Sequence, residues 1–246
     1  MKKEVVVQKN PKSPISEIFR TLRTNIQFIN SKKSLKTLLI TSTLPGEGKS
    51  WVSANLAVTF AEAGKKVLLI DADMRKGRQH TIFGVNNDCG LSNLLSGVDR
   101  SGRAETIDIS KYVLATEVQN LFVISKGEVP PNPSELLGSR VFSDFISAAR
   151  SVYEYIFIDT PPIGSVIDGA VVAHVCDGVC MVVETGWNSY RYAQKVKEQI
   201  EMADCKFLGV ILNKVKRNDK GYYGKYYGKY YGKYYGKYYC NPEDAS

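Results

Sequence analysis

Short apolar runs recur through most of the chain and have the length of buried β-strands. They lie at residues 38–40, 67–70, 121–124, 155–158, 179–183 and 207–212. Between them, apolar residues repeat with helical spacing at 49–63, 134–152, 169–175 and 189–203. Alternating strands and helices indicate a parallel sheet covered on both faces. We therefore predict an α/β fold built on a doubly wound, mostly parallel sheet.

A further amphipathic segment, residues 14–28, precedes the first of these strands. Its apolar stripe consists of Ile15, Ile18, Phe19, Leu22 and Ile26. This spacing predicts a helix, and Ser13 stands at the position of an N-cap. We predict that residues 1–33 form an N-terminal helical extension ahead of a core that spans residues 34–216.

The last part of the chain is a low-complexity segment. From Gly221 it reads GYYGKYYGKYYGKYYGKYYC, in which the unit YYGK occurs four times before Tyr238 and Tyr239. Glycine and lysine recur throughout it and no apolar periodicity is present, so the segment buries too little surface to offset its ordering entropy. We predict that residues 217–246 form a disordered, tyrosine-rich tail.

Composition narrows the classes of function. The formal charge of +8 would suit nucleic acid or an anionic membrane surface, but many of the basic residues lie in or just before the tail. No apolar run approaches the roughly 18–20 residues of a membrane span, so we expect a cytoplasmic protein. Five cysteines without a CxxC pair and two histidines argue against a zinc site.

The strongest motif is the stretch TSTLPGEGKS at residues 41–50, between a predicted strand and a predicted helix. This is the context of a P-loop, whose backbone N–H groups and helix N-terminus cradle phosphates. Lys49 would reach the β- and γ-phosphates, and the Ser50 hydroxyl would bind Mg²⁺. The usual first glycine of the motif is Thr43 here, and the alternative is a surface turn that contains GKS by chance.

Carboxylates follow two other buried strands. Asp71 and Asp73 follow the strand at 67–70, and Asp159 follows the strand at 155–158. Open α/β sheets bind ligands at the carboxyl ends of their strands. Alternation along a strand would point Asp71 and Asp73 the same way, toward one Mg²⁺ or one reacting hydroxyl. A single aspartate can simply cap a turn, but three beside a P-loop favour phosphoryl transfer.

These motifs together carry a family resemblance over nearly the whole chain. TSTLPGEGKS resembles a Walker A motif, VLLIDADMR a Walker A′ motif and YIFIDTPP a Walker B motif, and a tyrosine cluster ends the chain. The sequence resembles the bacterial tyrosine kinases of capsule and exopolysaccharide synthesis, of the split cytosolic type of Gram-positive bacteria. The resemblance implies a P-loop NTPase of the deviant-Walker, partition-ATPase-like group.

The resemblance also implies roles for individual residues. Asp71 would be the catalytic base, with Lys49 and Arg75 as further catalytic residues, and ATP and Mg²⁺ would be the cofactors. The predicted metal ligands are Ser50, Asp71, Asp73 and Asp159. The predicted nucleotide-binding residues are Thr43, Pro45, Gly46, Glu47, Gly48, Lys49, Ser50, Trp51 and Asn213, the last at the adenine. The predicted autophosphorylation sites are Tyr222, Tyr223, Tyr226, Tyr227, Tyr230, Tyr231, Tyr234, Tyr235, Tyr238 and Tyr239.

Partners follow from the same resemblance. Glu17, Arg20 and Arg23 fit the Glu-x-x-Arg-x-x-Arg pattern of a head-to-tail contact that closes a homo-oligomeric ring. The alternative is an intrahelical ion pair between Glu17 and Arg20. The resemblance further implies a separate membrane activator that recruits the protein to the inner face of the membrane, and a cognate tyrosine phosphatase.

The tail favours the kinase over its alternatives. Phosphorylation would reverse the sign of this cationic segment, which makes it a switch. A basic aromatic tail that binds RNA is one alternative, although no nucleic-acid partner is expected. A partition-type ATPase without kinase activity is another, but the early P-loop lysine of that class is absent from Thr41-Ser42-Thr43-Leu44. A purely structural protein would leave the aspartates and Lys49 unused.

Overall fold

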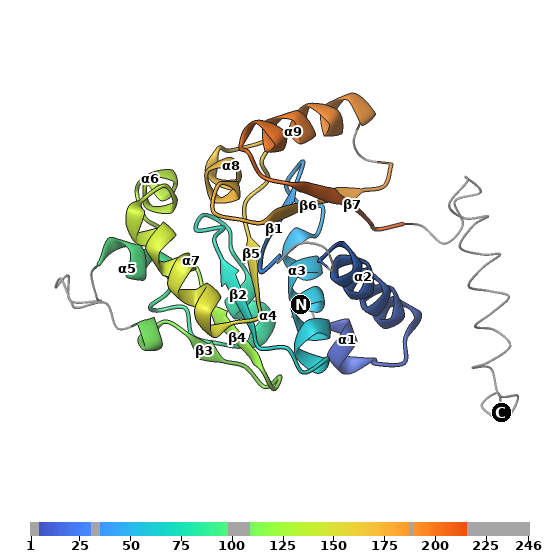
Figure 1. Ribbon diagram of the computed structural model, residues 1–246, viewed down its shortest axis with the longest axis horizontal. Helices are drawn as coiled ribbons and strands as arrows, with labels where there is room; N and C mark the ends of the chain where they lie inside the picture. The colour runs from blue at the N-terminus through green and yellow to red at the C-terminus, as the bar shows by residue number, and fades with distance from the viewer. Residues whose placement is uncertain (1–4, 31–34, 98–108, 187–188, 216–246) are drawn as a thin grey trace, which may run out of the picture.

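The computed structural model describes residues 5–30, 35–97, 109–186 and 189–215. A seven-stranded sheet crosses the molecule in the order β3-β4-β2-β5-β1-β6-β7 (Figure 1). The strands are β1 (Thr37–Ser42), β2 (Val67–Asp71), β3 (Leu114–Ala115), β4 (Leu121–Ile124), β5 (Tyr155–Asp159), β6 (Gly178–Glu184) and β7 (Phe207–Asn213). All neighbouring strands are parallel except β3, which pairs antiparallel to β4. The predicted doubly wound sheet is confirmed, and only the two-residue β3 was not predicted.

Helices connect the strands and cover both faces of the sheet. They are α1 (Val6–Lys9), α2 (Pro14–Asn30), α3 (Lys49–Glu62), α4 (Gln79–Phe83), α5 (Leu91–Ser96), α6 (Pro133–Leu137), α7 (Arg140–Val152), α8 (Asp168–Ala173) and α9 (Tyr190–Met202), with a 3₁₀ turn at Ile109–Lys111. The short helices α1, α4 and α5 were not predicted, because their few residues show no readable apolar period.

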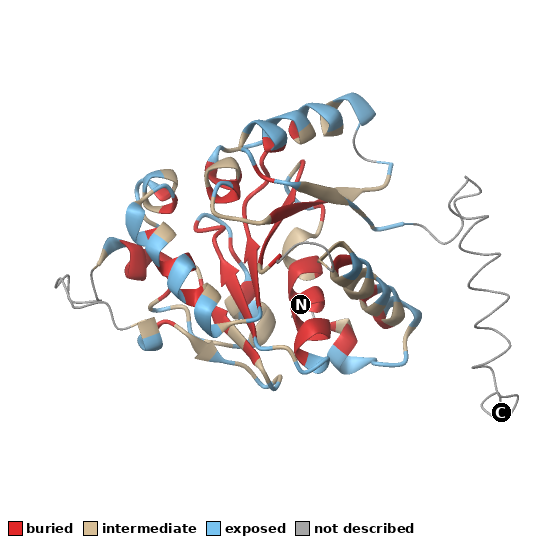
Figure 2. Ribbon diagram, in the orientation of Figure 1, coloured by how far each residue is buried: buried red, intermediate tan, exposed pale blue. Residues whose placement is uncertain are grey.

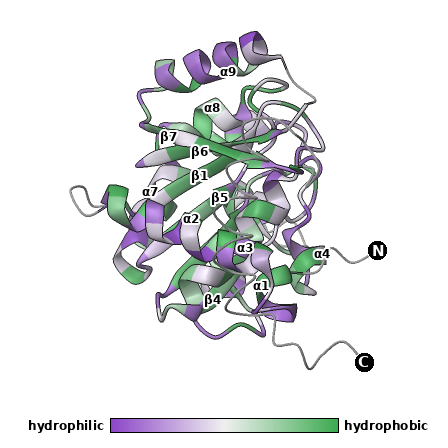
Figure 3. Ribbon diagram, turned by 90° about the vertical axis from the view of Figure 1, so that its right-hand side faces the viewer, coloured by the Kyte–Doolittle hydropathy of each residue, from purple (hydrophilic) through white to green (hydrophobic). Residues whose placement is uncertain are grey.

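Each face of the sheet has its own apolar core. Leu38 and Ile40 belong to the core under α3, whereas Leu39 belongs to the core under α7 to α9, because successive side chains of a strand point to opposite faces. Figure 2 shows the central strands and α3 as almost entirely buried. Figure 3 shows β1 and β6 as mainly hydrophobic and α9 as mainly hydrophilic. Burial on both faces explains why these strands read as continuous apolar runs.

The N-terminal extension packs directly on the core as an outer layer over α3 (Figure 1). Phe19 of α2 meets the Trp51 ring of α3 edge to face, with 5.3 Å between ring centroids. The backbone N–H of Val7 donates to the Asn55 side chain at 3.2 Å. Ser13 caps α2, because its hydroxyl accepts from the N–H of Ser16 at 3.2 Å. The extension is therefore part of one folded unit.

The single helix predicted over residues 134–152 is wrong, because the structure contains two helices there. Helix α6 ends at Leu137, and Ser139 is the N-cap just before α7, with its hydroxyl accepting from the N–H of Phe142 at 3.3 Å. The same hydroxyl donates to the carbonyl of Leu136 at 2.7 Å. Apolar spacing continued across Gly138 and Ser139 and concealed the break.

The structure also bears on the predictions about membrane spans and cysteines. No helix within the described ranges combines the length and the apolar character needed to cross a membrane. Cys89, Cys176, Cys180 and Cys205 are free thiols, and burial raises the pKa of Cys180 to about 12 and that of Cys205 to about 11. The predicted tail at 217–246 lies outside the described residues.

The N-cap at Ser139 provides a test of the α6–α7 break. Ser139→Ala should lower the free energy of unfolding by about 1 kcal/mol, because the first turn of α7 loses its side-chain acceptor. Urea unfolding followed by circular dichroism measures the loss. The matched control is Ser151→Ala on the exposed face of α7, which should change stability by less than about 0.5 kcal/mol. Equal losses in the two variants would contradict the cap.

Candidate functional site

The site lies where three neighbouring parallel strands end. Strands β2, β5 and β1 are consecutive in the sheet, so their carboxyl ends meet at one edge. Asp71 ends β2, and its register partner across the ladder is Asp159 at the end of β5. The loop that follows β1 is the glycine-rich segment that leads into α3. Sheet order therefore brings together motifs that lie far apart in the sequence.

The loop between β1 and α3 has P-loop geometry. Gly46 and Gly48 have φ angles of +88° and +94°, which side-chain-bearing residues rarely adopt. A Cβ at Gly48 would lie 2.2 Å from the Asn213 Nδ2 atom, so this position also requires glycine for space. Lys49 begins α3 directly after the loop. The N-terminus of α3 and the preceding N–H groups would supply the predicted anion-binding cradle.

A buried glutamate braces this loop. Glu47 Oε2 accepts from the Thr43 hydroxyl and from the N–H of Leu44, both at 2.8 Å. Glu47 Oε1 accepts from the N–H of Glu184 at 3.1 Å, which ties the loop to β6. Thr43 and Glu47, both predicted to bind nucleotide, thus use their side chains to shape the loop. Their contribution to phosphate binding would come from backbone N–H groups.

Two other predicted nucleotide residues lie beside the loop. Asn213 at the end of β7 donates from Nδ2 to the carbonyl of Glu47 at 2.8 Å, which places it at the P-loop although 166 positions separate the two residues. Trp51 packs its ring against Phe19 of α2. Contact of either residue with a base stays a prediction.

Lys49 is the largely buried cation of the site. Its Nζ lies 2.8 Å from Asp73 Oδ2 in an ion pair that is almost fully shielded from solvent. Burial lowers the pKa of Lys49, but the charges of Asp159, Asp73 and Asp71 outweigh it and raise the pKa above its usual value. Lys49 therefore stays protonated, as a residue that holds phosphates must.

Asp71 and Asp159 are fully buried carboxylates. Burial raises the pKa of Asp71 well above its usual value, and the charge of Asp159 raises it further. Burial also raises the pKa of Asp159, although Lys49, Ser50 and Gln79 oppose this effect. The Oδ1 atom of each carboxylate has no hydrogen-bond partner. A buried carboxylate oxygen without a hydrogen-bond partner raises the free energy of the folded state. A bound cation or a proton would remove this cost.

The residues fit Mg²⁺ better than an all-protein metal cage. Among the residues that the structure describes, no three His, Cys, Asp or Glu side chains gather in a metal-holding group. Mg²⁺ is usually bound through one or two carboxylates together with phosphates and water. The unpartnered Oδ1 atoms of Asp71 and Asp159, with the Ser50 hydroxyl nearby, supply such a partial set of ligands.

Asp73 departs from the predicted geometry. Strand β2 ends at Asp71, so the alternation that would point Asp71 and Asp73 the same way stops before Asp73. Asp73 lies in the following turn, where Oδ2 pairs with Lys49 and Oδ1 accepts from the N–H of Lys76 at 2.9 Å. Its place in a metal shell stays a prediction.

Arg75 lies in the same turn, and its partner was not predicted. Arg75 Nε lies 3.2 Å from Oδ2 of Asp168, a fully buried residue that begins α8. The Ser134 hydroxyl donates to Asp168 Oδ1 at 2.5 Å. This chain of contacts ties the turn after β2 to α6 and α8, while the Arg75 side chain itself stays partly exposed.

Gln79 is the other residue that the sequence did not reveal. It begins α4 and has no exposed surface, and its backbone and side chain contact Asp71 and Asp159 respectively. Gly77 makes this approach possible, because a Cβ there would lie 2.3 Å from Asp71 Oδ1. The only signal in the sequence was a glycine shortly before a glutamine, just after an acidic strand end.

The predicted oligomer residues have partners within their own chain. Arg20 pairs with Glu17 on the same helix. Arg23 Nη1 donates to the carbonyl of Thr59 on α3 at 2.7 Å. The intrahelical alternative for Glu17 and Arg20 is therefore the arrangement in the single chain, and a contact between copies stays a prediction.

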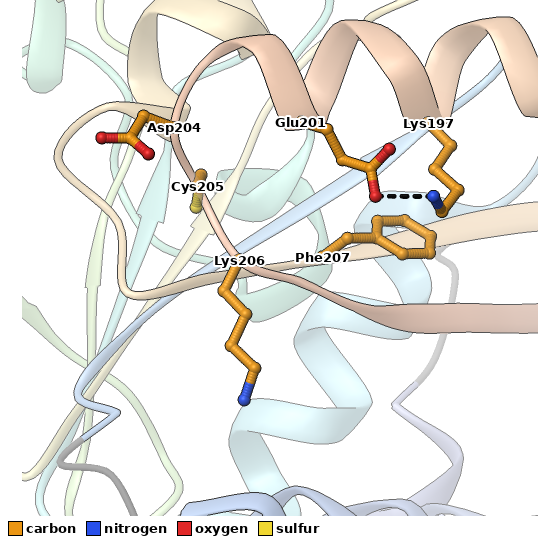
Figure 4. A pocket seen from close by; sticks show the side chains of 6 residues that line it. All are labelled: Lys197, Glu201, Asp204, Cys205, Lys206 and Phe207. Carbon is orange, nitrogen blue, oxygen red and sulfur yellow. Dashed lines mark hydrogen bonds and ion pairs between the residues drawn. The ribbon is translucent and has the colours of Figure 1, made fainter.

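A shallow depression of about 540 Å³ lies away from these motifs (Figure 4). It surrounds the start of β7, at the amino ends of the parallel strands, whereas the P-loop lies at their carboxyl ends. Lys197 pairs there with Glu201 above the Phe207 ring. These side chains satisfy one another, and the depression adds nothing to the site.

Comparison with known proteins identifies the family. The family model for an AAA domain matches residues 35–206. Tyrosine-protein kinase YwqD of Bacillus subtilis is 40% identical over 227 residues, which are 91% of this chain and 92% of that protein. Tyrosine-protein kinase CpsD of Streptococcus agalactiae is 44% identical over 215 residues, 85% of this chain and 90% of CpsD.

Solved structures agree. The crystal structure of the chimeric protein CapA2B2 has a TM-score of 0.80 at 40% identity and covers 86% of this chain and 89% of its own. The kinase domain of the Escherichia coli tyrosine kinase ETK has a TM-score of 0.81 at 34% identity, covering 89% of this chain and 83% of its own. MinD of Pyrococcus horikoshii, complexed with Mg-ADP, has a TM-score of 0.62 at 24% identity and shares the fold alone. The chain is a nucleotide-binding P-loop protein and belongs to the bacterial tyrosine-protein kinases.

Proposed function

We propose that this chain is an ATP- and Mg²⁺-dependent autokinase that phosphorylates the ten tyrosines between Tyr222 and Tyr239 of its own tail. The observation that carries the proposal is the buried cluster of Asp71, Asp73 and Asp159 around Lys49, beside a P-loop. Three carboxylates and one ammonium leave the cluster net negative, and bound Mg²⁺ would neutralise it and the phosphates.

Each residue of the cluster and the P-loop would have a separate role in phosphoryl transfer. Lys49, held by Asp73, would orient the β- and γ-phosphates. Asp71, a fully buried carboxylate at the end of β2, would accept the proton of the tyrosine hydroxyl. Ser50, Asp159 and Asp71 would hold the ion, and Arg75, paired with Asp168, would support the transferred group.

The wider setting is part of the same proposal. The kinase would regulate the synthesis and export of capsule or exopolysaccharide, a cognate phosphatase would reverse the modification, and a separate membrane activator would recruit the protein from the cytoplasm. Copies would join head to tail through Glu17, Arg20 and Arg23 of α2. Exposed Ile15, Ile18 and Phe28 on the same helix supply the apolar area that such a contact needs.

Lys49→Met tests the proposed catalysis. Loss of the buried cation should lower tail phosphorylation at least about 100-fold, because an electrostatic contact to the transferred group is removed. Phosphotyrosine mass spectrometry after incubation with ATP and Mg²⁺, with and without a candidate membrane activator, measures the effect. Lys65→Met, which removes an exposed lysine paired with Glu154, is the control and should stay active. ATP hydrolysis with an unmodified tail under every condition would indicate a partition-type ATPase instead.

Asp71→Asn should raise the thermal stability of the protein and lower its phosphorylation rate. The folded-state pKa of Asp71 lies above its unfolded value, so the folded protein loses stability as pH rises through that range. In EDTA the variant should therefore melt higher than wild type at pH 7.5, with a smaller gain at pH 5. Each 1 kcal/mol corresponds to about 2–4 °C in Tm for a protein of this size.

The same variant should lose about 10²- to 10⁴-fold in phosphorylation rate, because the general base is gone. Asp144→Asn on the exposed surface of α7 is the control for both measurements and should leave Tm and rate unchanged. A lower Tm for Asp71→Asn at pH 7.5 would show that the Asp71 carboxylate stabilises the fold and would refute the electrostatic account.

Phosphorylation of the tail should cause the proposed homo-oligomeric ring to dissociate. Each phosphate adds about 1.5 to 2 negative charges, so a few modified tyrosines make the tail anionic and repel it from acidic sites. Light scattering should show wild type falling in mass after ATP and Mg²⁺, while a variant with all ten tail tyrosines changed to Phe keeps its mass. Equal masses for the two proteins before and after treatment would refute this switch.

A further inference from the structure

Gln79 makes a dense set of contacts at the centre of the site. Its backbone N–H donates to Asp71 Oδ2 at 2.8 Å, and its side-chain Nε2 lies 2.8 Å from Asp159 Oδ2. The same Nε2 lies 3.0 Å from the Ser50 carbonyl and 3.0 Å from the Ser53 hydroxyl, both on α3. Gln79 therefore contacts the end of β2 through its backbone N–H, and its side-chain amide joins the end of β5 to the first turn of the P-loop helix.

These contacts divide the oxygens of two carboxylates. Gln79 occupies the Oδ2 atom of Asp71 and the Oδ2 atom of Asp159, whereas the Oδ1 atom of each is buried without a hydrogen-bond partner. Because Asp71 and Asp159 are register partners on adjacent strands, the two unpartnered oxygens belong to neighbouring positions in the sheet. A hydrogen bond to one oxygen restricts rotation of the carboxyl group about its last torsion, which is otherwise broad.

The amide of Gln79 has one group left. Its Oε1 is buried and has no donor. A hydrated Mg²⁺ keeps several of its water molecules, and each water is a hydrogen-bond donor. Gln79 Oε1 is thus a third acceptor in the same cluster and has the right chemistry for the hydration shell of an ion.

We propose that Gln79 is a positioning residue for the metal-nucleotide complex. It fixes Asp71 and Asp159 so that their Oδ1 atoms are the ones available to a divalent cation, and its contact with Ser50 couples them to the P-loop helix. The inference rests on the proposed kinase function for its role in turnover, but the metal-binding role stands on these contacts alone. Ligand-orienting neighbours of this kind typically change metal affinity or activity 10- to 100-fold.

The test uses Gln79→Met in the full-length chain. Methionine has a similar length but no amide, and the backbone N–H to Asp71 remains. ADP affinity is measured by calorimetry in EDTA and again in Mg²⁺, and the ratio gives the contribution of the metal. We expect Gln79→Met to keep the affinity of wild type in EDTA and to lose about 10- to 100-fold of the gain that Mg²⁺ provides. Phosphorylation kinetics should show a lower kcat with little change in KM at saturating Mg²⁺.

Gln199→Met, on the exposed side of α9, is the matched control and should behave as wild type. An unchanged Mg²⁺ gain in Gln79→Met, no Mg²⁺ gain in wild type, or an equal loss of affinity with and without Mg²⁺ would each overturn the proposal. If Gln79→Met does not fold, Gln79→Asn, which keeps an amide of shorter reach, is measured in the same way. A wild type that binds Mg-ADP but never phosphorylates tyrosine would refute the kinase while leaving the metal test intact.

Discussion

Three buried carboxylates share one buried lysine at the edge of the sheet, and this imbalance of charge governs the arrangement around it. Asp73 takes the direct ion pair with Lys49, which leaves Asp71 and Asp159 with raised pKa values and one unpartnered oxygen each. Removing charges from water costs several kcal/mol per ion unless partners compensate. A further cation would therefore lower the electrostatic cost of the cluster, and the surrounding fold holds its residues in place.

The fold supplies this support from several directions. Asp71 and Asp159 end adjacent parallel strands that are buried on both faces, so their backbones have no freedom to separate. Glu47 ties the P-loop to β6, and Asn213 ties it to β7. A loop braced by two neighbouring strands loses little further entropy when phosphate binds, which is the advantage of a preorganised site.

The sequence predicted the central strands and long helices better than the side-chain contacts between them. Long apolar runs and strongly periodic helices determine where the central strands and α3 lie, and parallel topology then brings the P-loop to Asp71 and Asp159. Gln79 was missed because it begins a short helix without a readable period, and Asp168 was missed because its contact with Arg75 joins residues 93 positions apart. The break at Ser139 was missed because apolar spacing continued through it, whereas only the hydroxyl contacts mark the cap.

A shared fold does not decide which nucleophile the site accepts. MinD shares the fold alone, and the P-loop lysine and strand-end carboxylates of the present chain could serve water as well as a tyrosine hydroxyl. Asp71 is fully buried, so an acceptor reaches it only when a segment or a water molecule enters the cluster. In the proposed kinase, a tail rich in tyrosine and lysine would be attracted to a net negative site before modification and repelled after it. The preference for a tyrosine hydroxyl over water would then depend on how the tail brings a tyrosine to Asp71. The buried carboxylates and Lys49 do not themselves discriminate between the two nucleophiles.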